Sequence, residues 1–301
     1  MKKSSYTVID RGHISNDFRL ISNKSKNPVY LTKWKKSSGE QTVAAKCCHH
    51  FHEDEAAILA RLNHKNIIKF FGVVLPTSIG ESHIIVTEYA EEGSLHDVIA
   101  RHCEHWPEYM QIESRWMKWA QDGARALQFI HQNKYQHGDV KSPNFLVTSD
   151  GTLKICDFGI SRKCELTIST VSNRGSWPWM APEAFGSVAY DPQSTRKPCK
   201  VTTKSDVFSY SIVIWEIMSG QAPHPGKQQI QIYKAVVERK ERPQIPSHCP
   251  EHQQMSELLN KCWQAEYRSR PTMDEVLQTL LDIDKSMRES TCITQSINIS
   301  N

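Results

Sequence analysis

The patterning of the chain changes once, near Gly93, from short β-branched runs to long helical repeats. Before that point VYLTKW and TVAAK lie on either side of the turn SSGEQ, as in a hairpin, and IIKFFGVV and HIIVTEYA follow a helical stretch from about His52 to Leu62. After it, apolar residues recur at helical spacing at about 114–133, 205–219, 227–239, 252–264 and 272–286. A strand-rich first third and a helical remainder predict two lobes in sequence, with a ligand in the cleft between them.

Composition excludes several classes of protein. Hydrophobic residues make up 39% and charged residues 23% of the 301 residues, as in ordinary globular domains. The 37 basic and 33 acidic side chains give a formal charge of +4, too weak a bias to indicate nucleic acid or a membrane surface as a partner. The longest apolar run, near SYSIVIWEIM, is far too short to span a bilayer as a helix.

Cysteine usage bears on the compartment. The nine cysteines are odd in number and scattered, and MKKSSYTVID has no apolar run behind its lysines. We therefore expect free thiols in a reducing compartment and a cytoplasmic protein. The cysteines and histidines between Cys47 and His52 leave zinc binding as an alternative, which is disfavoured because no recognised ligand spacing fits them.

Residues suited to phosphate chemistry follow one another in a fixed order. HGDVKSPNFLV contains Asp139, Lys141 and Asn144. An aspartate can accept the proton of a hydroxyl, a lysine can neutralise a moving phosphoryl group, and an amide oxygen can bind Mg²⁺. Thirteen residues after Asn144, Asp157 in DFG offers a carboxylate oxygen to the same cation. Asp139 and Asp157 as mere loop carboxylates are the minor alternative.

The matching upstream part is a lysine and a glutamate. Lys46 ends the strand VAAK, where its ammonium can reach the phosphates of a nucleotide, and Glu55 on the following helix can hold it in place. Glu55 as a solvated helix residue is the alternative. Each motif alone is weak, but the whole set in this order, closed by Ala181-Pro182-Glu183, is hard to obtain by chance.

This ordered set resembles the signature of protein kinases, over roughly residues 17–285. The resemblance implies an α+β, bilobal protein kinase fold, with a small β-rich N-lobe that has one main helix and a larger helical C-lobe. The implied boundaries are a flexible tail over 1–14, a kinase domain over 15–285 with its N-lobe at about 15–89 and its C-lobe at about 90–285, and a polar tail over 286–301.

The resemblance also implies ATP and Mg²⁺ as cofactors. Thr87 would be the gatekeeper behind the adenine, and Glu88 to Ala90 would form the hinge that binds it. Catalysis would depend on Lys46, Glu55, Asp139 and Lys141, and the metal on Asn144 and Asp157. Adenine would lie between Val29, Ala44 and Leu146. Ser176 keeps a hydroxyl for Asp139 and Lys141, and a lysine in this loop is typical of the serine/threonine type.

Longer segments narrow the resemblance further. Four segments look like those of the tyrosine-kinase-like group: IIVTEYAEEGSL, LKICDFGISR, SWPWMAPEA and SDVFSYSIVIWEI. Within that group they resemble the mixed-lineage MAP kinase kinase kinases of the leucine-zipper and sterile-α-motif type. This implies phosphoryl transfer from MgATP to serine or threonine of a protein substrate such as a MAP kinase kinase, in a stress-signalling cascade. A small-molecule kinase is disfavoured by the APE motif. The upstream activator and the oligomeric state are not specified by the residues.

Two features depart from the kinase pattern. The three positions that hold glycine in the phosphate-binding loop of kinases are occupied here by Ser22, Lys24 and Asn27. Glycine at these positions normally lets backbone N–H groups approach the phosphates. The favoured interpretation is a loop that still covers ATP, because the catalytic side chains are intact. The alternative is lost nucleotide binding, and then a pseudokinase or weak kinase that acts as a scaffold or allosteric partner.

The second departure is Gly138, where most kinases have an arginine that grips a phosphorylated activation-segment residue. Glycine has no side chain for this contact, so the usual switch is in doubt. Candidate phosphorylation sites nevertheless remain in the segment after DFG: Thr167, Ser169, Thr170 and Ser172.

Overall fold

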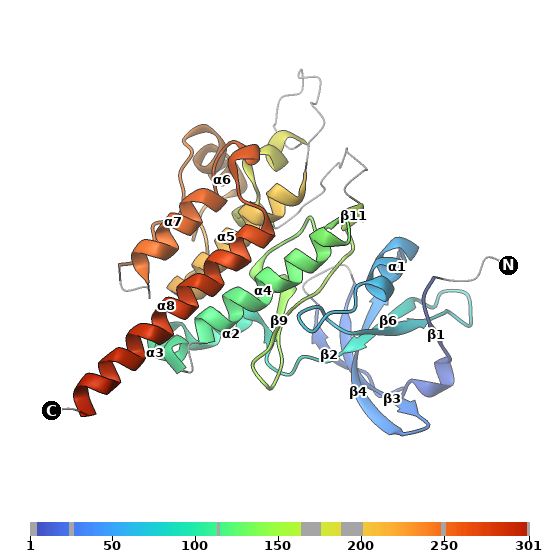
Figure 1. Ribbon diagram of the computed structural model, residues 1–301. Helices are drawn as coiled ribbons and strands as arrows, with labels where there is room; N and C mark the ends of the chain where they lie inside the picture. The colour runs from blue at the N-terminus through green and yellow to red at the C-terminus, as the bar shows by residue number, and fades with distance from the viewer. Residues whose placement is uncertain are drawn as a thin grey trace, which may run out of the picture.

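The computed structural model describes residues 5–23, 27–112, 115–163, 176–187, 201–247 and 251–299. The chain forms a small lobe built on a six-stranded sheet and a larger helical lobe (Figure 1). This arrangement confirms the α+β bilobal fold predicted from the sequence. The small lobe contains β1 (Val8–Ile9), β2 (Arg19–Ser22), β3 (Val29–Lys36), β4 (Gly39–Cys48), α1 (Glu53–Arg61), β5 (Phe70–Val74) and β6 (His83–Glu88).

The register of the small-lobe sheet decides which side chains meet. The sheet order is β1-β5-β6-β4-β3-β2. Val29 on β3 lies opposite Lys46 on β4, and Ala44 lies opposite Thr87 on β6. Because side chains of directly paired residues share a face, and residues two apart on a strand do so as well, these four side chains lie on one face of the sheet.

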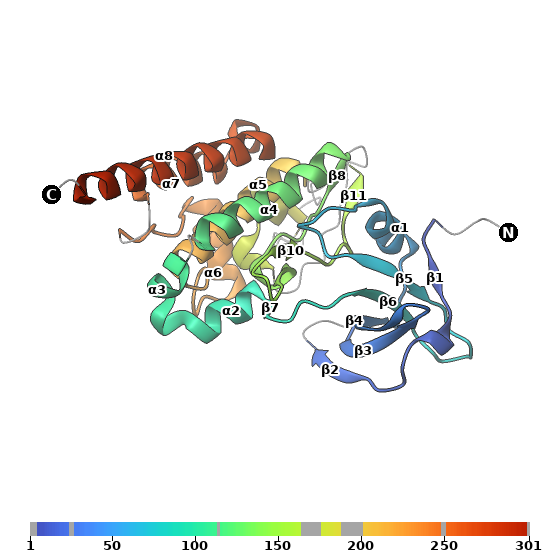
Figure 2. The same cartoon turned by 60° about the horizontal axis from the view of Figure 1, so that its bottom comes forward.

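The N-terminal segment covers the opposite face. There Val43, Ala45 and Val86 pack with Ile9 and Ile14 in one apolar cluster. β1 pairs in parallel with β5, at the outer edge of the sheet (Figure 2). The structure therefore differs from the expected flexible tail over 1–14 in the part that it describes, because burying two isoleucines offsets the cost of ordering this short segment.

In its described residues the large lobe consists mainly of helices, with one three-stranded and one two-stranded sheet beside them. Among the described residues no helix is long and apolar enough to cross a membrane. The elements of the large lobe are β7 (Gly93–Ser94), α2 (Leu95–His102), α3 (Trp106–Gln111), α4 (Arg115–Gln132), β8 (Tyr135–Gln136), β9 (Phe145–Val147), β10 (Leu153–Ile155), β11 (Arg162–Lys163), α5 (Thr203–Ser219), α6 (Gln229–Tyr233), which continues as a π-helical turn (Lys234–Glu238), α7 (His252–Cys262) and α8 (Met273–Ile299).

The last helix is longer than the sequence pattern predicts. We expect a helix over about 272–286 and a polar tail over 286–301, but α8 continues to Ile299. Apolar periodicity ends where the helix leaves the core, whereas the backbone continues because no glycine or proline interrupts it. An ion pair of Arg288 with Asp284, 2.9 Å apart, supports the helix there.

The helix α5 is buried along almost its whole length. Its N-terminus has a capping box between Thr202 and Ser205, and it ends at Gly220, whose φ of +66° suits a glycine. The sequence SDVFSYSIVIWEIMS is apolar on all sides, and such a helix belongs in a core. The large lobe is packed around it.

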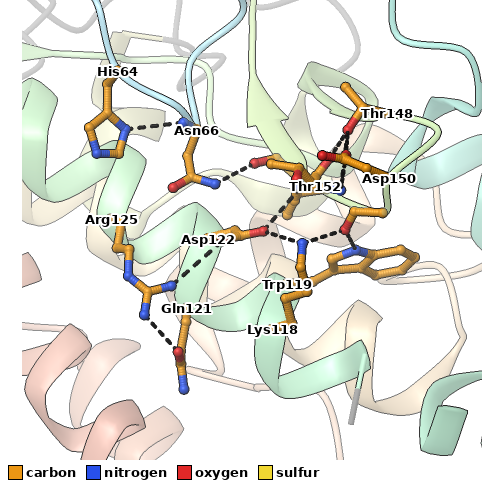
Figure 3. A network of polar contacts seen from close by, with 12 residues as sticks. His64, Asn66, Lys118, Trp119, Gln121, Asp122, Arg125, Thr148, Asp150 and Thr152 are labelled. Atoms are coloured by element: carbon orange, nitrogen blue, oxygen red, sulfur yellow. Dashed lines mark hydrogen bonds and ion pairs between the residues drawn. The ribbon is translucent and has the colours of Figure 1, made fainter. Parts of the chain in front are cut away.

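A polar network joins the connection between α1 and β5 to the large lobe (Figure 3). Asn66, after α1, donates its amide to the carbonyl of Leu153 at 3.0 Å, and Asp122 on α4 accepts from the backbone N–H of the same residue at 3.2 Å. Lys118 lies 3.1 Å from Asp122. The ring of His64 stacks on Phe129 of α4 with centroids 4.9 Å apart. The connection from α1 to β5 is thus fixed to the large lobe.

Replacing Ile9 tests whether the N-terminal strand is part of the fold. Ile9 is 4% exposed, whereas its neighbour Val8 is 46% exposed. We expect Ile9→Ala to lower the free energy of unfolding by about 2–4 kcal/mol, because it leaves a cavity in the apolar cluster. The matched control Val8→Ala should cost at most about 0.5 kcal/mol. Equal, negligible effects in urea denaturation would mean that this segment is a tail after all.

Candidate active site

The loop after β8 is anchored from below by a buried carboxylate. Asp206 of α5 accepts hydrogen bonds from the backbone N–H groups of His137, at 2.8 Å, and Gly138, at 2.9 Å, and lies 2.9 Å from the ring of His131. Burial pushes the pKa of Asp206 up, but the hydrogen bond and charge of His131 and the donors of the loop outweigh it, and its pKa is lowered. The carboxylate therefore stays ionised and fixes the start of the loop.

The polar side chains of this loop converge on Asp139. The ammonium of Lys141 lies 2.7 Å from one carboxylate oxygen of Asp139, and the hydroxyl of Ser176 donates to the other at 2.7 Å. Lys141 also donates to Ser176 at 2.9 Å. Asn144 donates its amide to the carboxylate of Asp139 at 3.0 Å. Side chains from up to 37 positions away in the sequence thus hold the aspartate in one orientation.

A second cluster lies where the sheet faces the large lobe. Lys46 lies 2.7 Å from Glu55 of α1 and 3.0 Å from Asp157. Burial works against the charged ammonium, but the two carboxylates outweigh it and raise the pKa of Lys46. The same contact, against the effect of burial, lowers the pKa of Asp157. Lys46 and Asp157 therefore carry charge at neutral pH, and the ion pair predicted between Lys46 and Glu55 is present.

The backbone aims Asp157 by an uncommon conformation. Its φ is +63°, a region that aspartate tolerates better than most residues. The next residue, Phe158, is 1% exposed and meets the ring of His137 edge-on at 5.0 Å. Cys156 donates its N–H to the carbonyl of Asn144 at 2.9 Å. These contacts connect the segment of Asp157 directly to the loop that carries Asp139.

The oxygen atoms of Asn144 and Asp157 fit a hard divalent cation. The amide nitrogen of Asn144 is engaged with Asp139, which leaves its carbonyl oxygen as the ligand atom. Lys46 occupies Oδ1 of Asp157, so Oδ2 is the oxygen available to a cation. Oxygen donors of this kind suit Mg²⁺, which binds few protein groups and otherwise takes phosphate oxygens and water.

The predicted adenine-binding side chains share one surface. Val29, Ala44 and Thr87 lie on the sheet face that carries Lys46. Leu146, on β9 of the large lobe, is half-buried against the main core. The carboxylate of Glu88 accepts from the backbone of Lys69 at 2.6 Å and lies 2.7 Å from Lys154. Ala90 follows after Glu88 and is 5% exposed, so the predicted hinge segment is held at both ends.

The glycine-free loop is described only at its two ends. Ser22 pairs with Val29 at the end of the β2–β3 hairpin, and Asn27 is half-buried. The carbonyl of Pro28 accepts from Cys47 at 2.9 Å. Lys24 lies outside the described residues. So do the four candidate phosphorylation sites Thr167, Ser169, Thr170 and Ser172.

Gly138 has a backbone reason to be glycine. Its φ is +80°, and a Cβ built on it would still have space, 3.5 Å from the nearest atom. The constraint is therefore the left-handed conformation, which costs an ordinary L-residue about 1–2 kcal/mol. A glycine at this position avoids backbone strain beside Asp139, and it also lacks the side chain with which an arginine would bind a phosphate.

Behind the site, Glu183 forms a bidentate pair with the buried Arg270. The two guanidinium nitrogens lie 2.7 and 2.8 Å from the two oxygens of Glu183, and Ser205 of α5 also donates to this carboxylate at 2.7 Å. One acid was missed: Glu216 of α5 is buried beneath the catalytic loop, and a single charged residue inside the apolar run SYSIVIWEIMS was its only signal in the sequence.

A bilobal fold that brings these two clusters together is that of a protein kinase, and comparison with known proteins agrees. The model of the protein tyrosine and serine/threonine kinase family matches residues 14–280. The chain therefore belongs to the protein kinase family.

Several relatives have names that match the predicted subgroup. The chain is 31% identical over 226 residues to serine/threonine-protein kinase STY17 of Arabidopsis thaliana, covering 75% of this chain and 36% of that protein. It is 32% identical over 256 residues to mitogen-activated protein kinase kinase kinase zak-1 of Caenorhabditis elegans (82% and 32%), and 32% identical over 237 residues to mitogen-activated protein kinase kinase kinase 7 of Drosophila melanogaster (77% and 32%). The chain thus spans about a third of the length of these relatives.

Substitution of Gly138 tests the strain argument. We expect Gly138→Ala to lower the free energy of unfolding by about 1–2 kcal/mol, because alanine must adopt the left-handed conformation. Gly138→Asn should cost less, since asparagine tolerates this region better. Urea denaturation of both variants measures the difference, and an alanine variant as stable as the wild type would show that the loop needs no glycine.

Proposed function

We propose that this chain is a serine/threonine protein kinase, which transfers the γ-phosphoryl group of ATP to hydroxyl groups of a protein substrate. One observation carries the proposal. The hydrogen-bonded set around Asp139 is joined through Cys156 and Asn144 to the ion cluster of Lys46 and Asp157. A proton acceptor and a phosphate-binding cation thus belong to one connected site, which is what phosphoryl transfer requires.

In the proposed mechanism each side chain has one task. Asp139 orients the substrate hydroxyl and accepts its proton, while Lys141 balances the charge beside it at 2.7 Å. Lys46, held by Glu55, binds the phosphates of the nucleotide. Asn144 and Asp157 would hold Mg²⁺, which supplies positive charge to the phosphate oxygens when it is bound.

The serine/threonine specificity is supported by the loop itself. Lys141 bridges Asp139 and the hydroxyl of Ser176, so the loop presents a lysine beside the proton acceptor. Three relatives carry names of serine/threonine or MAP kinase kinase kinases. We propose on this basis that the chain acts as a MAP kinase kinase kinase on a MAP kinase kinase, in the cytoplasm and in a stress-signalling cascade.

The second candidate is a pseudokinase that serves as a scaffold or allosteric partner. The observation that favours it is the absence of glycine at Ser22, Lys24 and Asn27, where backbone N–H groups should approach phosphate. Against it stands the assembled ion cluster of Lys46, Glu55 and Asp157, which offers the groups that bind the phosphates of a nucleotide and their cation. We therefore rank it second.

A transfer assay with an exposed-aspartate control tests the proposal. With MgATP and a recombinant MAP kinase kinase, we expect Asp139→Asn to reduce phosphate transfer to serine and threonine by about 10²–10⁴-fold, the usual effect of a general base. Asp150→Asn, at an exposed aspartate in the β9–β10 turn, should retain the wild-type rate. Transfer that survives Asp139→Asn, or no transfer by the wild type, would contradict the proposal.

A further inference from the structure

The buried acid Glu216 is unused by the mechanism above. It lies near the end of α5 and is 1% exposed. One of its carboxyl oxygens is 2.7 Å from the hydroxyl of Ser142, and the other accepts from the indole N–H of Trp179 at 2.7 Å. Burial of an acid is costly unless its polar atoms are satisfied, and here both oxygens have a partner.

The two partners belong to the two chain segments that meet at Asp139. Ser142 is 0% exposed and directly follows Lys141 in the catalytic loop. Trp179 ends a short 3₁₀ turn whose N-cap is Ser176, and its backbone N–H donates to the carbonyl of Ser176 at 3.1 Å. The segments are thus joined twice: at the front by the contacts of Ser176 with Asp139 and Lys141, and at the back by Glu216.

The surroundings of Glu216 favour its neutral form. Burial raises the pKa of this acid to about 8, and the hydrogen bonds from Trp179 and Ser142 offset it only in part. The charged groups of the neighbouring elements are engaged elsewhere, Lys141 with Asp139 and Arg270 with Glu183. Asp206, on α5 itself, lies against His131. Among the described residues no recorded ion pair includes Glu216.

A neutral acid can make both contacts without leaving a charge in the interior. It has one O–H donor and one carbonyl acceptor. The O–H group can donate to the oxygen of Ser142, whose hydroxyl both donates and accepts, while the carbonyl oxygen accepts from Trp179. An ionised Glu216 keeps the geometry only at the cost of an unpaired buried charge.

We propose that Glu216, as a neutral carboxylic acid, is a positioning residue that fastens the catalytic loop and the segment of Ser176–Trp179 to α5. Its effect on turnover rests on the proposed kinase function; its effect on the fold does not. The contacts of Glu216 lie next to the segments that carry Asp139 and Ser176, where the substrate hydroxyl would bind. Their loss therefore lowers kcat and leaves the KM for ATP within about twofold.

The activity test compares an isostere with an apolar residue of similar size. Glu216→Gln keeps one donor and one acceptor and is expected to retain most of kcat at pH 7, whereas Glu216→Leu loses both and falls by about tenfold or more. From pH 7 to 9 the wild type should lose about tenfold in kcat as the acid ionises, and Glu216→Gln should not. Glu257→Gln, at an exposed acid of α7, is the control and should follow the wild-type profile.

A stability test does not depend on catalysis. A group whose pKa is raised in the folded state lowers the stability of the protein as the pH rises from the group's unfolded-state pKa to its folded-state pKa. The melting temperature of the wild type should therefore fall relative to that of Glu216→Gln between about pH 4.5 and 8 and then stay level. Glu257→Gln should again match the wild type.

The two tests separate the two proposals. If the wild type transfers no phosphate but the melting temperatures diverge as described, the kinase function fails and the neutral acid stands. Parallel melting curves of wild type and Glu216→Gln across this pH range would overturn the neutral acid. Diverging curves together with identical pH profiles of kcat would overturn the positioning role.

Discussion

The burial of α5 is the constraint on which the site depends. An apolar helix inside the large lobe cannot move independently, so groups that it carries are fixed references for the loops around it. Asp206 at its first turn holds the N–H groups of His137 and Gly138, and Ser205 holds the carboxylate of Glu183. The catalytic loop and the segment after it are thus ordered by one helix, although they are separated in the sequence.

The second requirement is that the two lobes meet in one geometry. Lys46 belongs to the sheet, Glu55 to α1, and Asp157 to the large lobe, and their charges bring three elements together within 3.0 Å. Behind them the network of Asn66 and Asp122 holds the lobes at a second point (Figure 3). In this structure the site is assembled without a side chain at Gly138 for a phosphate, and that glycine takes its left-handed conformation without strain.

Much of this follows from the sequence because motif order limits the fold so strongly. The alternation of VYLTKW and TVAAK fixes the register that faces Val29, Ala44 and Lys46 toward the cleft. The N-terminal strand was not predictable in the same way, because Val8 and Ile9 are too few residues for a pattern and their burial depends on a distant strand. The contacts of Glu216 were not predictable for a related reason. The partners of this acid, Ser142 and Trp179, come from two other segments of the chain, and they meet it only in the folded structure.

The proposed kinase function depends most on whether the cluster of Lys46 binds nucleotide without loop glycines. The direct measurement is the melting temperature of the wild type, Lys46→Met and Asp157→Ala with and without millimolar MgATP, with the exposed Lys69→Met as control. We expect MgATP to raise the melting temperature of the wild type and of Lys69→Met by several degrees, and not that of the other two variants, because a ligand that binds only the folded state stabilises it. If all four proteins are folded and MgATP changes the melting temperature of none of them, the kinase function is contradicted and the chain is a pseudokinase that acts as a binding partner.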